Sequence, residues 1–245
     1  MSSSKRPGPT PAPGFSIASP TSGTFVALLE PAEWERLQEL GRPVTFPSGS
    51  VLMYEHEPSD RVMIVLAGHV KTTVLGDGGR ETLLSIRDPG DVLGELASID
   101  GQPRSATVTA LGPVQALLIS ASAFRTHLET TPRIAVAVLQ VISRRFREST
   151  VMRSQLTGSD TIGRLAACLV ELADRYGETT DDGVVIRLPL SQDELGAWIG
   201  ASRAGLAAAL KTLRELGWIA TQRRRIVVRE TEALRSRGAS RLEHS

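Results

Sequence analysis

The sequence predicts an α+β protein with an N-terminal β-roll, a long central helix and a C-terminal winged helix-turn-helix. Between residues 44 and 119, short β-rich segments alternate with turn residues at regular spacing, which is typical of an antiparallel roll or barrel. After Pro132, apolar residues recur at alternating intervals of four and three, which predicts a long helix. Between Ser191 and Lys211, helix-start signals lie on either side of a glycine, which predicts two short helices joined by a tight turn.

Composition excludes several classes of protein. The formal net charge is only +1, which argues against a histone-like polycation but permits a local basic patch. A single cysteine, Cys168, excludes an intrachain disulfide framework and an iron–sulfur cluster, and four scattered histidines do not complete a zinc site. The sequence shows no nucleophile–base pair, no metal-ligand spacing and no Walker loop, so we expect neither an enzyme nor a metal protein.

Membrane segments are not expected either. The longest uncharged run, Ser105 to Phe124, is too polar and too broken by turn residues for a membrane helix. The N-terminus has no apolar segment of the secretory kind. We therefore expect a cytoplasmic protein with no membrane partner.

The predicted elements divide the chain into five segments. We expect a disordered tail rich in Pro, Ser and Gly, then the β-roll, the long helix, the winged helix-turn-helix and a second tail. Their ranges are 1–23, 24–131, 132–158, 159–235 and 236–245. The N-terminal tail is either a flexible linker or a contact for RNA polymerase, and its composition favours the linker.

Within the roll, a short helix is expected at Pro31–Leu40, ending at Gly41. The expected strands of the roll are Arg61–Leu66, Val70–Leu75, Glu81–Ile86, Ala106–Leu111 and Val114–Ile119. Beyond the long helix we expect an amphipathic helix, a strand, a helix pair and a hairpin, at Thr161–Tyr176, Gly183–Leu188, Ser191–Gly217 and Trp218–Val228.

The long helix carries a repeat that predicts a coiled-coil contact in a homodimer. The residues of this seam are Val138, Ile142, Arg145, Ser149, Met152 and Leu156. The alternative is that the helix packs on its own domain. Arg145 and Ser149 are polar positions in the middle of the seam, so they need a partner there: water, a register-setting pair or a ligand.

A candidate anion cradle lies between two predicted strands, at residues 94–107. Gly94 allows close backbone approach, and the residues after it can open one helical turn with free N–H groups. Arg104 offers a guanidinium fork and Ser105 a hydroxyl donor. Glu95 would then accept from a sugar hydroxyl or orient Arg104. The alternative is a plain Arg104–Glu95 ion pair in a turn.

The helix pair has the chemistry of a helix-turn-helix. Ser191 and Glu194 form a capping box, Gly196 is small where helices cross, Gly200 permits a positive φ, and Ser202 caps the second helix. Its expected core is Leu195, Ile199, Leu206 and Leu210. An ordinary helical hairpin is the alternative. The following hairpin favours a winged helix-turn-helix on DNA, because its arginines, Arg223, Arg224 and Arg225, can meet phosphates.

Two motifs give a resemblance to a known family. Pro89-Gly90-Asp91, Gly94-Glu95-Leu96 and Pro103-Arg104-Ser105-Ala106-Thr107 resemble the phosphate-binding cassette of cyclic-nucleotide-binding domains. The stretch from about Phe25 to Thr157, and the helix-turn-helix after it, resemble the cyclic-AMP receptor protein/fumarate-nitrate regulator (Crp/Fnr) family. The resemblance covers most of the chain in the right order.

The resemblance implies a ligand site for a cyclic nucleotide. Arg104 and Ser105 would bind the cyclic phosphate near the N–H groups of Leu96 and Ala97, beside Gly94. Glu95 would bind the ribose 2′-hydroxyl. Ser149 and Thr150 align with a hydroxyl pair that reads the base. This set favours cAMP over another cyclic nucleotide or an orphan pocket. The iron–sulfur branch is excluded, and His56 and His69 are expected on the surface rather than as haem ligands.

For DNA, the resemblance implies that Ser202 and Lys211 contact phosphates and that Arg203 reads a guanine. Ala204, Ala208 and Gly205 depart from the family pattern, because two polar base contacts and a threonine are missing. Asp193 is expected on the backbone side, where its charge repels phosphate. We therefore expect a relaxed or shifted DNA site and weaker binding than is usual in the family.

These expectations describe a homodimeric transcriptional regulator whose binding to double-stranded DNA is modulated by a cyclic nucleotide, with cAMP favoured. One alternative is a family member that binds DNA independently of nucleotide. Another is a cyclic-nucleotide sensor that acts mainly through protein contacts, which the alanines of the second helix suggest.

Overall fold

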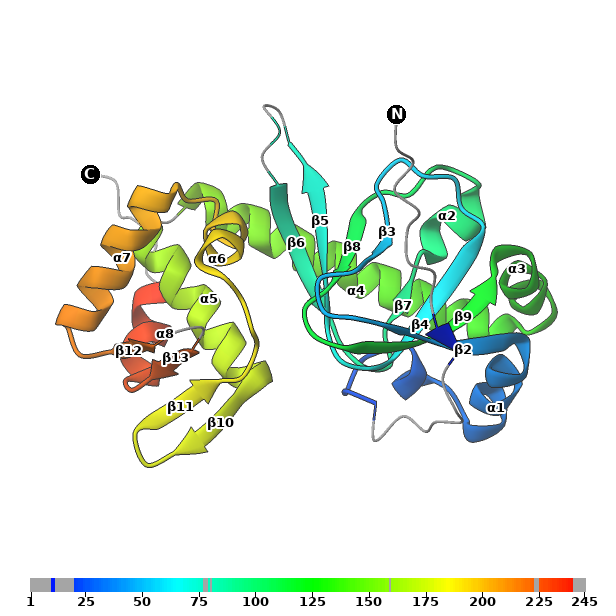
Figure 1. The fold of residues 1–245 in the computed structure, drawn as a ribbon, viewed down its shortest axis with the longest axis horizontal. Coiled ribbons are helices and arrows are strands. Elements are labelled where there is room, and N and C mark those ends of the chain that lie inside the picture. Colours follow the sequence, from blue (N-terminus) through cyan, green and yellow to red (C-terminus); the bar gives the residue numbers. More distant parts are fainter. Residues whose placement is uncertain are drawn as a thin grey trace. The chain divides into compact units, whose positions relative to one another are not determined.

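The computed structural model describes residues 10–11, 20–76, 79, 81–158, 160–222 and 225–239. The chain folds as two compact units: residues 1–74 with 84–145, and residues 75–83 with 146–245 (Figure 1). No helix in the described ranges is both long and apolar enough to cross a membrane.

The first unit is built on two antiparallel sheets, as the strand spacing predicts. One sheet has the order β1-β2-β9-β4-β7 and the other β3-β8-β5-β6. Their strands are β1 (Thr10–Pro11), β2 (Gly41–Phe46), β3 (Val51–Met53), β4 (Arg61–Ala67), β5 (Val70–Leu75), β6 (Glu81–Arg87), β7 (Val92–Leu93), β8 (Thr107–Ala110) and β9 (Val114–Ser120). All five predicted strands are present, within one residue at every end, whereas β1, β2, β3 and β7 were not predicted.

The two faces of β4 serve two different cores, because successive side chains of a strand point to opposite sides. Met63 and Val65 are buried inside the roll, between the two sheets. Val62 and Ile64 face a second core that the helices complete. These helices are η1 (Val26–Leu28), α1 (Pro31–Leu40), α3 (Ala121–Thr130) and the long α4 (Pro132–Gly158). The helix α1 has the predicted bounds, and α3 was not predicted.

The first half of α4 packs on its own domain. Val138 is 1 % exposed and lies in the core with Val141, and Ile142 packs against the same cluster. The prediction that Val138 lies in a seam between subunits is therefore wrong, and packing within the domain is confirmed for this residue. Ile142 is only partly buried, so its place in a seam stays a prediction. Met152 and Leu156 lie in a part of α4 whose side chains are outside the described residues.

The segment before α1 belongs to the first unit. Thr21 and Val26 donate backbone hydrogen bonds to the carbonyls of Pro89 and Gly90, at 3.3 and 3.0 Å. Phe25 is fully buried, and its ring meets that of Phe124 edge-on, with the ring centroids 6.5 Å apart. The expectation of a disordered tail is therefore wrong for residues 20–23, and residues 10–11 form the strand β1. Residues 1–9 and 12–19 lie outside the described residues.

The second unit combines helices with a four-stranded antiparallel sheet of order β10-β11-β13-β12. Its elements are α5 (Thr161–Tyr176), β10 (Gly177–Thr180), β11 (Gly183–Ile186), α6 (Gln192–Trp198), α7 (Arg203–Glu215), β12 (Ile219–Gln222), β13 (Arg225–Val228) and α8 (Thr231–Ala239). The predicted helix, helix pair and hairpin are all present, and the predicted strand at Gly183–Leu188 is present as β11, two residues shorter. The strand β10 and the helix α8 were not predicted, and α8 covers the first residues of the expected C-terminal tail.

The helix-turn-helix follows the local signals. The capping box of Ser191 and Glu194 is formed, Gly200 has a φ of 62°, and the Ser202 side chain accepts from the Gly205 N–H. The four predicted core residues are at most 3 % exposed. The prediction that the helix crossing requires a small residue at Gly196 is wrong. A Cβ added there would come no closer than 3.4 Å to its neighbours, which is an ordinary contact.

We predict that Phe25→Ala lowers the free energy of unfolding of the first unit by about 3–5 kcal/mol, because it leaves a cavity beside Phe124. Urea denaturation followed by circular dichroism measures this. Leu84→Ala removes a 43 % exposed side chain of the same unit and should change the stability by less than about 0.5 kcal/mol. Equal effects of the two substitutions would show that the N-terminal segment is not part of the core.

Candidate functional site

The predicted anion cradle begins at Gly94, which has a φ of 77° and caps the short helix α2 (Glu95–Asp100). A Cβ at Gly94 would lie 2.0 Å from Nη1 of Arg104, so the glycine leaves room for the guanidinium. The helix α2 corresponds to the helical turn that the sequence predicts after Gly94. Leu96 on its surface is 42 % exposed, whereas Ala97 is 4 % exposed.

Arg104 is held from both its backbone and its side chain. Its backbone exchanges hydrogen bonds of 2.9 Å with His56 and Glu57. Its guanidinium, 4 % exposed, donates from Nη1 to the Gly94 carbonyl at 3.0 Å and from Nη2 to the Arg61 carbonyl. The nearest carboxylate oxygen in its ion pairs, Oδ1 of Asp60, is 3.9 Å away. Arg104 is therefore a fixed, buried cation whose close partners are neutral carbonyls.

The surroundings of Arg104 disfavour its charge. Burial and the positive charge of Arg61 lower the pKa of the Arg104 guanidinium, and Asp60, Glu95 and Glu57 oppose this only in part. An anion bound at this position would reverse the effect, since an opposite charge favours the charged form. Ser105, next in the chain, is exposed beside this group.

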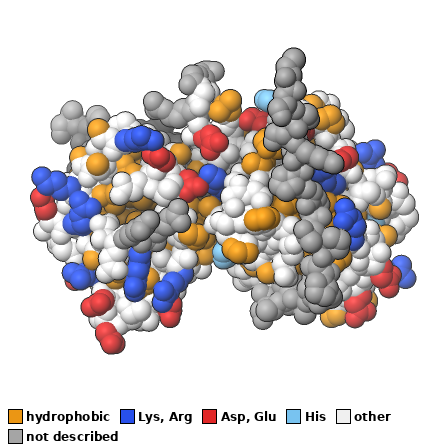
Figure 2. Space-filling view, viewed as in Figure 1, with side chains coloured by type: hydrophobic (Ala, Val, Ile, Leu, Met, Phe, Trp, Pro, Cys, Tyr) orange, Lys and Arg blue, Asp and Glu red, His pale blue; other side chains and the backbone are white. Residues whose placement is uncertain are grey.

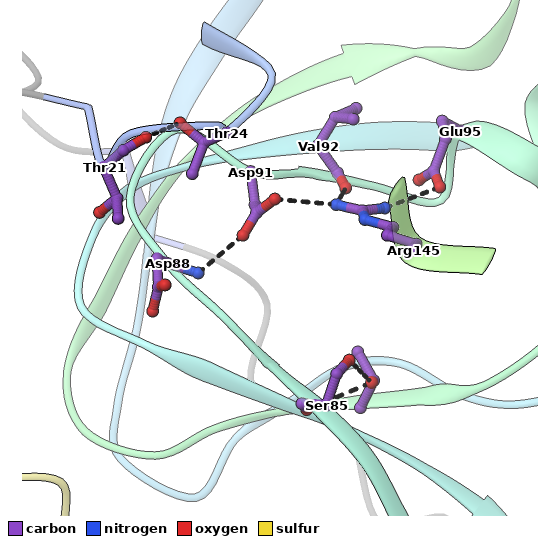
Figure 3. Close-up of polar contacts among 9 residues, drawn as sticks. Thr21, Thr24, Ser85, Asp88, Asp91, Val92, Glu95 and Arg145 are labelled. Carbon is purple, nitrogen blue, oxygen red and sulfur yellow. Dashed lines mark hydrogen bonds and ion pairs between the residues drawn. The ribbon is translucent and has the colours of Figure 1, made fainter. Parts of the chain in front are cut away.

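Glu95 does not pair with Arg104. Its Oε1 accepts from Nη1 of Arg145 at 2.8 Å (Figure 3). Nη2 of the same guanidinium donates to Oδ1 of Asp91 at 3.0 Å and to the Val92 carbonyl at 2.9 Å. The Arg104–Glu95 ion pair considered as an alternative is therefore wrong, and Arg145, expected in the dimer seam, is bound inside its own domain instead.

This Asp91–Arg145–Glu95 cluster lies out of water. The side chains of Asp91, Glu95 and Arg145 are 5 %, 6 % and 14 % exposed. Burial lowers the pKa of Arg145, but the charges of Glu95 and Asp91 and the hydrogen bonds to them outweigh it, so the pKa is raised. The second oxygen of Asp91 accepts from the Asp88 N–H at 3.0 Å. The cluster thus fixes the turn before α2, the start of α2 and one point of α4 together.

The sequence pattern did not assign Asp91 a role, although it quoted the residue within its motif. The only signal was a carboxylate next to a Pro-Gly turn. Its partner is 54 positions away along the chain, and no local pattern reveals such a distance.

The other predicted ligand residues on α4 lie in the second unit. Ser149 and Thr150 are exposed, and the Thr150 hydroxyl donates to the Phe146 carbonyl at 3.0 Å. Their part in reading a base stays a prediction. Nearby along α4, three large apolar side chains are exposed: Val136 at 50 %, Leu139 at 60 % and Phe146 at 73 %.

The predicted DNA contacts of the second unit begin at the N-terminus of α7. Ser202 caps this helix, and Arg203 follows it, 87 % exposed. Lys211 is 70 % exposed and lies 3.7 Å from Glu215. Arg225 is half-buried at the start of β13, opposite Gln222, whereas Arg223 and Arg224 lie outside the described residues.

Asp193 contacts Arg203. Its two carboxylate oxygens accept from Nε and Nη2 of Arg203, at 2.7 and 2.8 Å. Arg203 therefore balances the charge of Asp193, and the expected place of Asp193 on the DNA backbone side stays a prediction. The exposed positions after Arg203 are alanines, Ala204, Ala207 and Ala208, as the sequence indicated. On the face shown in Figure 2, Lys and Arg side chains of the second unit are interrupted by Asp and Glu side chains.

No group of His, Cys, Asp and Glu side chains that could hold a metal occurs in the described part of the chain. Cys168 is buried in α5, and burial raises the pKa of its thiol. A thiol in such surroundings is a packing residue rather than a nucleophile.

Comparison with known proteins identifies both units. The cyclic nucleotide-binding domain family matches residues 43–131, and the Crp-like helix-turn-helix domain family matches residues 163–237. The CRP-like cAMP-activated global transcriptional regulator of Mycobacterium tuberculosis is 34 % identical over 211 residues, which cover 85 % of this chain and 93 % of the relative. The chain belongs to the Crp/Fnr family of transcriptional regulators.

A second relative in the Crp/Fnr family is the cAMP-activated global transcriptional regulator CRP of Salmonella typhimurium, 30 % identical over 75 % of this chain and 87 % of its own length. Among solved structures, the c-di-GMP responsive global regulator CLP of Xanthomonas campestris has a TM-score of 0.74 at 22 % identity, covering 81 % of this chain and 99 % of its own. A CooA mutant from Carboxydothermus hydrogenoformans has a TM-score of 0.72 at 17 % identity, covering 92 % and 100 %. These two likenesses show the fold.

The Asp91–Arg145–Glu95 cluster generates a prediction about stability. Arg145→Met leaves two buried carboxylates without their cation, so it should lower the free energy of unfolding by about 3–5 kcal/mol. The triple variant Asp91→Asn, Glu95→Gln, Arg145→Met removes all three charges together and should recover most of this loss. Urea denaturation at pH 7 measures both. A triple variant as unstable as Arg145→Met would contradict an electrostatic origin.

Proposed function

We propose that this protein is a homodimeric regulator whose binding to double-stranded DNA is modulated by a cyclic nucleotide, with cAMP favoured. The proposed ligand site rests on Arg104. Its buried guanidinium is fixed by two backbone carbonyls, and Asp60 supplies the nearest carboxylate oxygen in its ion pairs. An anion that approaches from solvent would stabilise the charged form of this guanidinium. A cyclic phosphate has the single charge and paired oxygens that a guanidinium fork binds.

The position of Glu95 favours a ligand that carries a sugar next to the phosphate. Arg145 holds its Oε1, while Oε2 accepts no hydrogen bond from any described residue. A carboxylate that is already oriented in this way can accept from a ribose hydroxyl without giving up its buried cation. Ser105 and the N–H groups of Leu96 and Ala97 would complete the phosphate contacts, and Ser149 and Thr150 would contact the base.

The choice of cAMP rests on the relatives. The two curated relatives named above are called cAMP-activated. The structural neighbour CLP is called c-di-GMP responsive, so a different nucleotide is the main competing effector on this fold.

Calorimetric titration with cAMP, cGMP and c-di-GMP tests the ligand site. Arg104→Ala should weaken cAMP binding by at least about 30-fold, because it removes a buried charge partner. Ser105→Ala should weaken it by about 10-fold through the loss of one hydrogen bond to a charged group. Arg42→Ala removes an equal charge from an exposed position of β2 and should leave the affinity unchanged.

Since Arg104 also holds two backbone carbonyls, the thermal unfolding of Arg104→Ala must be checked beside the titration. Ser105 is exposed, so its variant keeps the test valid if Arg104→Ala unfolds. Wild-type affinity in a folded Arg104→Ala, or no effect of Ser105→Ala, would overturn the assignment. Tighter binding of cGMP or c-di-GMP would change the effector but not the site.

The exposed side of α4 supports the proposal of a homodimer. Val136, Leu139 and Phe146 are separated by three and seven residues, the spacing of a coiled-coil stripe, and Thr150 continues it. We propose this stripe as the dimer contact in place of the predicted seam, which lies on a different side of α4. Exposed apolar residues at this spacing favour a second copy of the same helix as their partner.

Leu139→Glu should convert the dimer to a monomer in analytical ultracentrifugation, because it places a carboxylate in the apolar stripe. Thr126→Glu adds the same charge at an exposed position of α3, away from the stripe, and should leave the dimer intact. A Leu139→Glu variant that sediments as the wild type would refute this interface.

The DNA contacts proposed for the second unit are Ser202 and Lys211 to phosphates, Arg203 to a guanine and the wing arginines to phosphates. One alternative is a regulator that binds DNA equally well without nucleotide. A gel-shift titration with and without cAMP distinguishes it: the proposal requires a change in affinity, and the alternative requires none. No DNA binding even at low salt would favour a sensor that acts through protein contacts.

A further inference from the structure

The exposed pair of Arg203 and Asp193 joins the two helices of the helix-turn-helix. Asp193 lies in α6 and Arg203 is the first residue of α7 (Figure 1). Their side chains are 63 % and 87 % exposed, so neither contributes to the hydrophobic core. Both oxygens of Asp193 are engaged with one edge of the guanidinium.

Asp193 binds one edge of the Arg203 guanidinium, and the donors of another edge bind no described residue. A guanidinium has five N–H groups in a fixed plane. Asp193 takes one from Nε and one from Nη2. The two N–H groups of Nη1 and the second of Nη2 donate to no described residue. These groups form the end of the fork, whose geometry matches O6 and N7 of guanine.

We propose that Asp193 is a positioning residue for base readout: it holds the Nε–Nη2 edge of Arg203 so that the Nη1–Nη2 end faces a guanine. This inference rests on the proposed DNA-binding function. A long arginine side chain loses rotamer freedom when it binds, and a carboxylate that orients it beforehand reduces that loss. The pair also cancels the acidic charge that would otherwise repel phosphates.

The rest of α7 makes this positioning important. The exposed residues that follow Arg203 are Ala204, Ala207 and Ala208, which have no polar side-chain atoms. Hydrogen-bonded base readout at this end of α7 therefore depends on Arg203. If its guanidinium were free to rotate, it would contact a nearby phosphate as readily as a base, and the sequence information would be lost.

The opposite role for Asp193 is competition, in which it occupies Arg203 and must be displaced by DNA. The two roles predict opposite results. A positioning residue raises the discrimination between sequences. A competing residue lowers the affinity for every sequence. The experiment therefore measures discrimination and overall affinity separately.

The first step is selection of a binding site from a random DNA library by the full-length protein with cAMP, followed by sequencing. Kd is then measured for the selected duplex, for the duplex with 7-deazaguanine at each guanine in turn, which removes N7, and for a scrambled duplex. For wild type, we expect one guanine of each half-site whose 7-deaza replacement weakens binding by about 5- to 150-fold.

In Asp193→Asn, the amide cannot accept from both donors of Arg203. We expect the 7-deazaguanine effect at that one guanine to fall at least fivefold, while effects at other positions stay unchanged. Asp193→Glu, which keeps both acceptor oxygens, should restore part of the effect. Asp182→Asn removes the same charge from an exposed position of the β10–β11 turn and is the matched control.

A double-variant cycle ties the effect to the pair. In an Arg203→Ala background, Asp193→Asn should have no further effect on discrimination. Thermal unfolding of each variant excludes a loss of folding, since a purely structural role would weaken binding to all duplexes equally and leave their ratios unchanged.

The outcomes separate the inference from the function on which it rests. Unchanged ratios in Asp193→Asn with tighter binding to every duplex, beyond the gain seen in Asp182→Asn, would show competition and overturn the inference alone. A wild type that selects a site but shows no guanine effect would overturn the assigned role of Arg203. A wild type that enriches no sequence would overturn the DNA-reading function itself, and the inference with it.

Discussion

The Asp91–Arg145–Glu95 cluster is the constraint on which the rest of the first unit depends. The guanidinium of Arg145 is 14 % exposed, and two carboxylates, Asp91 and Glu95, offset the cost of its burial. This fixes the rotation of α4 about its axis. Val141 and Val138 lie four and seven residues before Arg145, on the same side of the helix, and both enter the core. The stripe of Val136 and Leu139 is then left on the outside.

The predicted seam residues show why the sequence alone could not tell which side of α4 packs on its own domain. The helix has apolar residues on two sides, and both stripes follow the three-and-four spacing of a coiled coil. Only burial distinguishes the stripe that packs on the roll from the stripe that is exposed. The polar residue in the middle of the first stripe was a usable signal: Arg145 did need a partner, but its partners are 50 and 54 positions away rather than in a second subunit.

Elements with strong local signals were predicted well. The helices α1 and α5 and the hairpin of β12 and β13 have clear starts, stops and turns, and the structure contains them. The two-residue strand β7 and the three-residue strand β3 are too short for any periodicity, and pairing with distant strands defines them. The same holds for the sites. Local chemistry predicted the turn at Gly94 and the helix cap at Ser202, which the structure contains, whereas the ion pairs of Glu95 and Asp193 depend on tertiary contacts.

The Asp91–Arg145–Glu95 cluster and the pair of Arg203 and Asp193 differ in exposure, and this difference suits them to different tasks. Opening the Asp91–Arg145–Glu95 cluster would strand buried charges at a cost of about 3–5 kcal/mol. A ligand shifts an equilibrium only by its difference in affinity for the two states, so a ligand that had to break this cluster would lose much of its effect. Binding through Oε2 of Glu95 and through Arg104 avoids that cost and leaves α4 anchored. The pair of Arg203 and Asp193, being exposed, costs at most about 1 kcal/mol to rearrange. The buried cluster is therefore suited to fix the start of α2 against α4, whereas the exposed pair can bias the orientation of Arg203 only by a small free energy.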